Sequence, residues 1–254
     1  MGTLENKTAL VTGSSRGIGR ATALRLAAEG AVVAVHYASN GTAAKETLVA
    51  IESAGGKGFL VQAELGVPGD VDTLVTALTA GLVEHTGEAR LDILVNNAGI
   101  MGGVKPEDLT GEIFDRLMAV NAKAPLFLTL KVLEFMPDGG RIVNIGTGLL
   151  RYANPEEIAY SMSKGALDQT SLHLARLLGP RNITVNTVSP GVTNNGTPIF
   201  EVPEAREFMA NMTAFKRIGE PEDIADVVAF LASNDARWIT GTFVDASGGT
   251  LLGG

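Results

Sequence analysis

The stretch TGSSRGIG, residues 12–19, follows a short apolar run and precedes a helical pattern. Gly13 allows a tight turn, Gly17 lets the backbone approach a pyrophosphate, and Gly19 lets a helix and a strand pack closely. The first amides of a helix donate to phosphate oxygens and carry partial positive charge. The spacing is GxxxGxG, and a purely structural turn is the alternative. Between a strand and a helix, the stretch predicts a dinucleotide site.

Predicted strands and helices alternate outward from this turn along nearly the whole chain. Apolar runs rich in Val and Ile predict strands at 8–11, 31–36, 57–62, 91–95, 141–145, 183–188 and 242–245. Longer periodic stretches predict helices at 21–29, 42–54, 70–85, 106–120, 124–135, 158–178 and 221–233. This alternation predicts a single α/β Rossmann domain, doubly wound around a parallel seven-stranded sheet. The domain spans 1–254, with a cofactor half to about residue 150 and a catalytic and substrate half from 151 to 254.

Composition narrows the class of protein. Hydrophobic residues make up 45% of the 254 residues and charged residues 19%, a balance that supports a buried core. The net charge of −8 repels phosphates, which argues against nucleic acid and anionic membranes as partners. The chain has no cysteine, no secretory signal and no apolar stretch that could span a bilayer. We therefore expect a cytoplasmic protein that binds neither nucleic acid nor membrane.

The three histidines give no sign of a metal site. His36, His85 and His173 lack spacing partners of the kind that metal ligands or a catalytic triad would need. We expect them at the surface or at the ends of the sheet, and we expect no bound metal.

The end of the second predicted strand indicates which dinucleotide binds. NAD sites usually place Asp or Glu there to bind the ribose hydroxyls. This chain reads Tyr37-Ala38-Ser39-Asn40, without an acid. Ser39 and Asn40 can donate hydrogen bonds to a 2′-phosphate, and Arg16 can add a charge-assisted bond. A solvated loop cation is the alternative for Arg16, and the predicted cofactor is NADPH/NADP+.

Two residues with acid–base chemistry begin the long helix predicted at 158–178. Tyr160 and Lys164 are four residues apart and therefore share one helical face. A free phenol has a pKa of about 10, and a nearby ammonium is expected to lower it toward the range useful for acid–base catalysis. An exposed helix pair is the alternative interpretation of this spacing alone.

Taken together, these residues resemble the short-chain dehydrogenase/reductase family. The match covers essentially the whole chain and includes TGSSRGIG (12–19), NNAG (96–99), Asn121, YSMSK (160–164), Ser189-Pro190-Gly191, and the C-terminal Ile239-Thr240-Gly241, Asp245 and Gly248-Gly249.

The resemblance implies a role for each matched position. Tyr160 would protonate the substrate oxygen, Lys164 would hold the nicotinamide ribose, and Asn121 would position a relay water. The implied cofactor contacts are Gly13, Ser15, Arg16, Gly17, Ile18, Gly19, Tyr37, Ala38, Ser39, Asn40, Glu64, Leu65, Asn97, Ala98, Gly99, Tyr160, Lys164, Pro190, Gly191, Val192, Thr193 and Asn195. A brace at the strand end is a compatible interpretation of NNAG.

Three positions depart from the family pattern. The family normally reads Asn-Ile-Ser-Ser after the fifth strand, where this chain reads NIGT (144–147), so Thr147 takes the place of the carbonyl-binding Ser. Its hydroxyl can make the same bond but its methyl takes space, so we expect activity with altered substrate fit or a slower rate. Glu64-Leu65 replaces Asp-Val beside adenine, and Asn195 replaces a carboxamide-binding Thr.

The residues expected around the nicotinamide are apolar. The predicted substrate contacts are Met101, Leu149, Leu150, Tyr152, Phe200 and Met209, with Met212 and Phe215 in the same covering segment. Apolar walls with few polar anchors fit a flat hydrophobic ketone better than a sugar. Packing of a lid or a subunit contact is the alternative.

Two further stretches, 191–198 and 245–253, resemble actinomycete ketoreductases that tailor aromatic polyketides, the angucycline C-6 ketoreductases in particular. The resemblance implies NADPH-dependent reduction of a ketone to a secondary alcohol on a hydrophobic polycyclic polyketide, as a step of antibiotic biosynthesis. It also implies a homotetramer.

Two other functions stay open. A 3-oxoacyl-[acyl-carrier-protein] reductase would need a basic patch for its acidic carrier, whereas Lys105, Arg116, Lys123 and Arg151 are thinly spread. A non-catalytic NADP-binding protein is favoured only by Thr147, and the intact tyrosine and lysine argue against it.

Overall fold

The computed structural model describes residues 2–250. Its sheet has seven strands: β1 (Thr8–Val11), β2 (Val32–Tyr37), β3 (Lys57–Gln62), β4 (Ile93–Asn96), β5 (Arg141–Ile145), β6 (Thr184–Pro190) and β7 (Phe243–Ala246). The spatial order is β3-β2-β1-β4-β5-β6-β7, and every neighbouring pair is parallel. The order reverses between β1 and β4, where ligands bind in doubly wound sheets. The predicted α/β Rossmann fold is confirmed.

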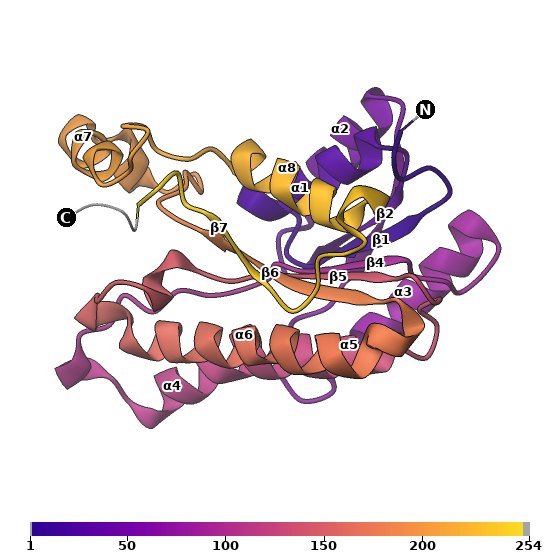
Figure 1. Cartoon of the computed structure of the whole chain (residues 1–254), viewed down its shortest axis with the longest axis horizontal. Coiled ribbons are helices and arrows are strands. Elements are labelled where there is room, and N and C mark those ends of the chain that lie inside the picture. Colours follow the sequence, from indigo (N-terminus) through magenta and orange to yellow (C-terminus); the bar gives the residue numbers. More distant parts are fainter. Residues whose placement is uncertain (1, 251–254) are drawn as a thin grey trace.

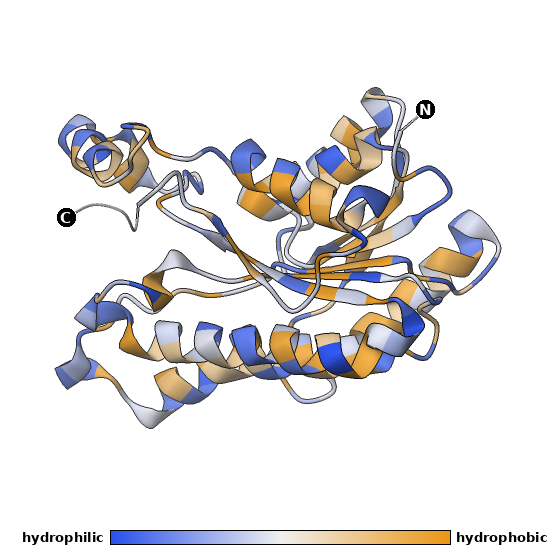
Figure 2. Ribbon diagram, in the orientation of Figure 1, coloured by the Kyte–Doolittle hydropathy of each residue, from blue (hydrophilic) through white to orange (hydrophobic). Residues whose placement is uncertain are grey.

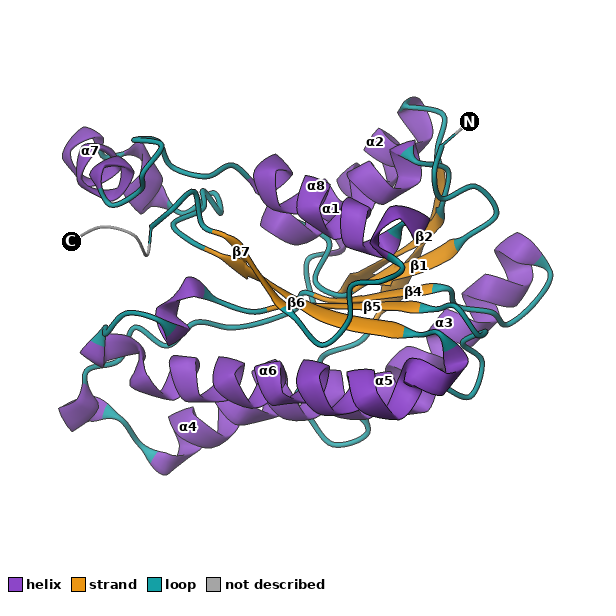
Figure 3. Cartoon of the chain, viewed as in Figure 1, coloured by secondary structure: helices purple, strands orange, loops and turns teal. Residues whose placement is uncertain are grey.

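Helices cover both faces of the sheet (Figure 1). One layer contains α1 (Gly17–Ala28), α2 (Gly41–Ser53) and α8 (Pro221–Ala232). The other contains α3 (Asp70–Thr86), α4 (Gly111–Met118), α5 (Ala124–Val132) and α6 (Ile158–Leu178). The short α7 (Pro203–Asn211) stands apart from both layers, beyond β7 (Figure 3).

The core is formed by strands that are buried on both faces. Ala9 and Val11 of β1 pack in one hydrophobic cluster, and Leu10 between them packs in the other. Successive strand residues face opposite sides of a sheet, so each side of β1 meets its own layer of helices. Figure 2 shows this pattern as apolar colouring along the strands and along the helix faces turned toward them.

Two predicted helices have different bounds in the structure. Helix α1 begins at Gly17, inside the glycine turn, whereas the apolar periodicity predicted a start at residue 21. The helix predicted at 106–120 divides into a 3₁₀ turn (Pro106–Asp108), α4, and a π-helical turn (Ala119–Lys123) that runs into α5. Thr110 accepts a bond from the Ile113 amide and so starts α4 after the 3₁₀ turn.

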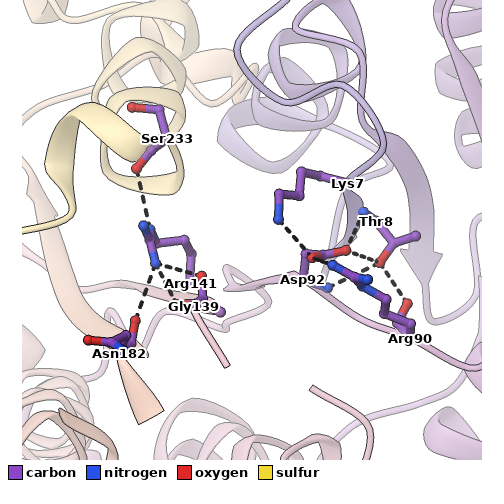
Figure 4. Close-up of polar contacts among 9 residues, drawn as sticks. Lys7, Thr8, Arg90, Asp92, Gly139, Arg141, Asn182 and Ser233 are labelled. Atoms are coloured by element: carbon purple, nitrogen blue, oxygen red, sulfur yellow. Dashed lines mark hydrogen bonds and ion pairs between the residues drawn. The ribbon is translucent and has the colours of Figure 1, made fainter. Parts of the chain in front are cut away.

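Polar side chains join the amino ends of the strands, at the edge opposite the glycine turn (Figure 4). The buried Asp92 pairs with Lys7 at 3.1 Å and with Arg90 at 2.8 Å, and it accepts from the Thr8 amide at 3.1 Å. Arg141, also buried, donates to main-chain oxygens that include that of Ser233, after α8. The Asp92 contacts therefore join β1 to β4, and the Arg141 contacts join β5 to the end of α8.

Replacement of Asp92 by Ala is expected to lower the free energy of unfolding by about 2–3 kcal/mol, because it leaves Lys7, Arg90 and the Thr8 amide without their shared acceptor. Burial alone would raise the pKa of Asp92, but the bonds from Arg90, Lys7 and Thr8 hold it below its ordinary value. The stabilisation is therefore complete above about pH 4 and is lost as the pH falls further.

Urea unfolding of the Asp92→Ala variant measures this loss. Asp138→Ala is the matched control, because Asp138 is exposed and pairs only with Arg181 at the surface. Equal losses in the two variants would contradict the role of Asp92.

Candidate active site

The glycine turn lies at the carboxyl end of β1 and leads directly into α1. A Cβ on Gly19 would lie 2.3 Å from the Gly13 carbonyl oxygen and 2.4 Å from Asn97 Nδ2, so only glycine fits there. Gly17 has φ +56°, and a Cβ on it would meet nothing within 4 Å. The turn is therefore tightly packed on its inner side and open at Gly17, as a phosphate-binding turn requires.

The residues that follow β4 support this turn through hydrogen bonds. Asn97 Nδ2 donates to the carbonyl oxygens of Thr12 at 2.8 Å and Gly13 at 3.1 Å. In return, the Thr12 hydroxyl accepts from the amides of Asn97 and Ala98, at 2.9 and 3.0 Å. The NNAG segment thus has the bracing role considered from the sequence, and its contact with a cofactor stays a prediction.

His36 supports the turn from β2, a function that the sequence did not reveal. Its side chain is buried near the carboxyl end of β2, so His36 lies at the end of the sheet, as one of the two expectations had it, and not at the surface. Nδ1 accepts from the Gly13 amide at 2.9 Å, and Nε2 lies 3.0 Å from the Ala63 carbonyl oxygen. Burial lowers the pKa of His36 to about 4, so the imidazole is neutral and Nε2 carries the proton.

The residues predicted to hold a 2′-phosphate lie beside the turn. Ala38, Ser39 and Asn40 are exposed after β2, and the Asn40 side-chain oxygen caps α2 by accepting from the Ala43 amide at 3.0 Å. Within residues 2–250, the side chain of the exposed Arg16 makes one hydrogen bond, from Nη1 to the Asn195 carbonyl oxygen at 3.4 Å. Its guanidinium therefore keeps donors for a further anionic ligand.

The adenine end carries one ion pair. Glu64, after β3, pairs with Arg116 of α4 at 2.9 Å, while Leu65 beside it is buried. Their predicted contacts with adenine stay predictions.

Tyr160 lies in the first turn of α6, with Thr147 of the loop after β5 beside it. Burial raises the pKa of the Tyr160 phenol to about 12, a side-chain hydrogen bond with Thr147 lowers it, and the charge of Glu157 raises it further. The expectation that Lys164 lowers this pKa is wrong here, because burial dominates. The phenol is consequently a fully protonated donor at neutral pH.

Lys164 lies one turn along α6 and is buried. Its Nζ donates to the Ile145 carbonyl oxygen at 2.8 Å, and burial lowers the pKa of the ammonium to about 8. A Cβ on Gly99 would lie 3.4 Å from this Nζ, so glycine keeps the space beside it open. An ammonium has three donors, and those not used by Ile145 suit the ribose hydroxyls of a dinucleotide.

Asn121 lies in the π-helical turn, where such bulges often mark functional sites. Its Nδ2 donates to the Ile100 carbonyl oxygen at 2.8 Å and to Ser163 Oγ at 3.0 Å, and its Oδ1 accepts from the Ile100 amide at 2.9 Å. The side chain thus ties the loop after β4 to α6. A relay water would have to bind to its main chain.

Comparison with known proteins identifies the family. The family model described as enoyl-(acyl carrier protein) reductase matches residues 13–250. A short-chain dehydrogenase/reductase from Serratia marcescens superimposes with a TM-score of 0.90 at 37% identity, covering 98% of this chain and 99% of that one. The chain belongs to the short-chain dehydrogenase/reductase family. Its members are oxidoreductases, so the predicted family and enzyme class are confirmed.

Two more similar members of the family have solved structures. LugOII, a promiscuous reductase of lugdunomycin biosynthesis, is 62% identical with a TM-score of 0.98, over 99% of this chain and 100% of that one. The angucycline C-6 ketoreductase LanV with bound NADP is 60% identical with a TM-score of 0.97, over 99% and 98%. The structure of LanV with bound NADP and rabelomycin is 58% identical to this chain with a TM-score of 0.94, and the match covers 99% of both chains. The predicted resemblance to angucycline ketoreductases is confirmed.

The loop that follows β6, at the carboxyl end of the sheet, contains the predicted nicotinamide contacts. A Cβ on Gly191 would lie 2.7 Å from both Ser247 Cβ and Thr250 Oγ1, so this short-chain reductase needs glycine there. The Asn195 side-chain oxygen accepts from the Thr197 amide at 3.1 Å, which leaves its nitrogen for a carboxamide. Contacts of Pro190, Val192 and Thr193 with a cofactor stay predictions. Residues 251–253, the end of the second polyketide-type stretch, lie outside the described residues.

The predicted substrate residues differ in exposure. Met101 is 60% exposed and Leu150 is 38% exposed, whereas Leu149, Tyr152 and Met209 are half-buried. Phe200, in the 3₁₀ turn Pro198–Glu201, is only 6% exposed. Met101 and Leu150 are therefore the best placed to meet an apolar ligand, and the role of the others stays a prediction.

Proposed function

We propose that this enzyme uses NADPH to reduce a ketone of a hydrophobic, polycyclic aromatic polyketide to a secondary alcohol, as a step of antibiotic biosynthesis. The observation that carries the proposal is the protonated Tyr160 phenol at the carboxyl edge of the sheet, whose pKa burial raises to about 12. Support for the substrate class comes from LanV, which at 58% identity binds NADP and rabelomycin. Ketone-dependent oxidation of NADPH tests the proposal.

The residues of this chain can perform the proton chemistry of such a reduction. Bound NADPH supplies the hydride that adds to the carbonyl carbon. Tyr160 donates its proton to the carbonyl oxygen as negative charge develops there, and the Thr147 hydroxyl donates a second hydrogen bond to that oxygen. Lys164 binds the ribose hydroxyls, and the main chain of Asn121 holds the water that returns a proton to the site.

The cofactor fits the open turn. The amides at the start of α1 would hold the pyrophosphate, and Gly17 would leave the space for it. No acid stands among residues 37–40, so nothing there repels a 2′-phosphate. Arg16 and Ser39 are exposed beside this site and supply the donors.

Replacement of Arg16 by Ala is expected to weaken NADPH binding about ten-fold or more and to change NADH binding by less than about two-fold. The lost contact is a charge-assisted bond to the 2′-phosphate, which NADH lacks. Fluorescence titration measures both affinities. Arg20→Ala is the matched control, since Arg20 is an exposed cation one turn further along α1. Equal losses for the two dinucleotides would exclude this role.

Reduction of a carrier-bound acyl group is the second candidate, and the charges disfavour it. Arg116 pairs with Glu64, and Arg151 pairs with Asp245 at 3.3 Å. Two of the four cations that could attract an acidic carrier are therefore offset by carboxylates. A binding protein without turnover is the third candidate, and the intact pair of Tyr160 and Lys164, one turn apart on α6, argues against it.

We also propose the homotetramer that the family resemblance implies. Large apolar side chains are exposed on the outer faces of two helices: Phe127 and Leu130 on α5, and Leu172 and Leu177 on α6. Contact with further copies of the chain would bury them. Within residues 2–250, no helix is long and apolar enough to cross a bilayer.

A further inference from the structure

Glu157, in the 3₁₀ turn just before α6, is a buried carboxylate that the mechanism does not use. Its side chain is 7% exposed, and no lysine or arginine of residues 2–250 forms an ion pair with it. Its partners are two main-chain amides: Oε2 accepts from Gly102 at 3.2 Å, and Oε1 accepts from Gly103 at 3.0 Å. A buried charge held only by amides is costly and calls for a function.

We propose that Glu157 is a positioning residue for the ketone: its carboxylate clamps the loop that carries Met101 against the start of the helix that carries Tyr160. This inference rests on the proposed function. It assigns to Glu157 the task of fixing the wall against which the substrate lies, and it assigns no contact with the reacting atoms.

The clamp places the loop that carries Met101 beside Tyr160, the proposed proton donor. A Cβ on Gly102 would lie 3.2 Å from Glu157 Oε2 and 3.8 Å from Tyr160 Cβ, so the loop passes close to both residues and glycine keeps this approach open. Gly103 has φ +61°, a conformation that other residues rarely adopt. The Gly102-Gly103 pair thus lets the chain turn so that two successive amides meet one carboxylate.

The loop is anchored at both ends. Asn121 exchanges two hydrogen bonds with the main chain of Ile100, and the Val104 amide donates to the Glu156 carbonyl oxygen at 3.0 Å. Met101 lies between these anchors and is 60% exposed. A flat apolar ligand placed over Tyr160 would cover this side chain, so the position of the loop affects ketone binding more than cofactor binding.

The charge of Glu157 also acts on the phenol. Burial has the largest effect on the pKa of Tyr160 and raises it, whereas Thr147 lowers it. The charges of Glu157 and Tyr152 raise this pKa by smaller amounts. Lys164 and Asp168 are the other ionisable groups on this part of α6, and Arg151 beyond the β5 loop pairs with Asp245. Residues 100–104 and 146–150 contain no ionisable side chain. Glu157 is therefore the nearby carboxylate that favours the protonated, proton-donating phenol.

The test compares Glu157→Gln with Glu156→Gln in the full-length protein. The two changes remove one negative charge at adjacent positions, but the Glu156 side chain is exposed and makes its contact with the loop through its main chain. Hydrogen exchange of the 100–104 segment reports the clamp without turnover. We expect exchange about ten-fold faster in Glu157→Gln and unchanged in Glu156→Gln, because glutamine has one acceptor oxygen for two amides.

Kinetics supply the second measurement. In Glu157→Gln the KM for a polycyclic ketone is expected to rise about ten-fold while the Kd for NADPH changes less than about two-fold. The alkaline limit of kcat is expected at lower pH, since the phenol loses its proton more readily. If Glu157→Gln does not fold, Glu157→Asp keeps the charge and shortens the reach; we then expect faster exchange with an unmoved alkaline limit.

Exchange and KM values that match those of Glu156→Gln would overturn the inference. Wild-type protein that oxidises no NADPH with any ketone would instead contradict the proposed function, because the exchange result stands without turnover.

Discussion

Replacement of Tyr160 by Phe is expected to reduce ketone turnover by about 10²–10⁴-fold and to leave the Kd for NADPH within about two-fold of wild type. The phenol oxygen is the proton donor in the proposed reaction, and phenylalanine keeps the ring while removing that oxygen. Burial raises the pKa of this phenol to about 12, so the lost group is a protonated acid across the neutral range.

Tyr152→Phe is the matched control for this change. Tyr152 is a second half-buried phenol, on the loop before α6, and burial raises its pKa as well. Steady-state assays at saturating NADPH are expected to show a much smaller loss of turnover in Tyr152→Phe, because Tyr152 is a predicted substrate contact that donates no proton to the ketone. Full activity in Tyr160→Phe, or an equal loss in both variants, would mean that the acid has been assigned to the wrong residue.

Replacement of Lys164 by Met is expected to abolish turnover and, at the same time, to make the cofactor-free protein more stable. Turnover should fall by about 10²-fold or more, because the ribose hydroxyls lose their buried donor. Stability should rise by about 1–2 kcal/mol near pH 7, or roughly 2–8 °C in Tm. Burial lowers the pKa of Lys164 to about 8, so the folded protein holds this proton less tightly than the unfolded chain.

The pH dependence of the free energy of unfolding tests this prediction. Below about pH 8 the folded protein must bury a charged ammonium, whereas at about pH 10 the buried amine is neutral and the unfolded chain still binds the proton. Wild-type stability should therefore rise with pH across this window, and the advantage of Lys164→Met should shrink. Lys131→Met, which changes an exposed lysine on α5, is the control. A less stable Lys164→Met protein at pH 7 would contradict this account.

The fold and the cofactor turn could be predicted because their signals are local. A short apolar strand, a glycine turn and a helix follow one another within about twenty residues at 8–28, and the alternation of strand and helix repeats along the chain. Glycine positions could be assigned from spacing alone, and the structure supplies the reason: a Cβ on Gly19 would collide with the turn itself.

The parts that could not be predicted depend on contacts between distant residues. His36 joins Gly13 to Ala63, at the ends of three separate strands. The apolar run before it predicts the strand, but no local pattern indicates these two contacts. Glu157 meets Gly102 and Gly103 across more than fifty positions, so the clamp has no local pattern.

The environment of Tyr160 and Lys164 also could not be predicted from the sequence. The spacing of Tyr160 and Lys164 predicts a shared helical face, and α6 confirms it. Spacing carries no information about burial, which proves to be the largest influence on both groups. The expected direction of the phenol's pKa shift was therefore wrong, and the catalytic roles of the two residues stay predictions.

The central claim is tested most directly by NADPH oxidation with a panel of carbonyls, with NADH in parallel and the product identified by mass. The panel contains polycyclic aromatic ketones, quinones, acetoacetyl thioesters and simple sugars. We predict turnover on a polycyclic ketone with NADPH, slower turnover with NADH, and a product that is heavier by two hydrogens. Turnover confined to the thioesters, or tight NADPH binding without turnover on any carbonyl, would contradict the claim.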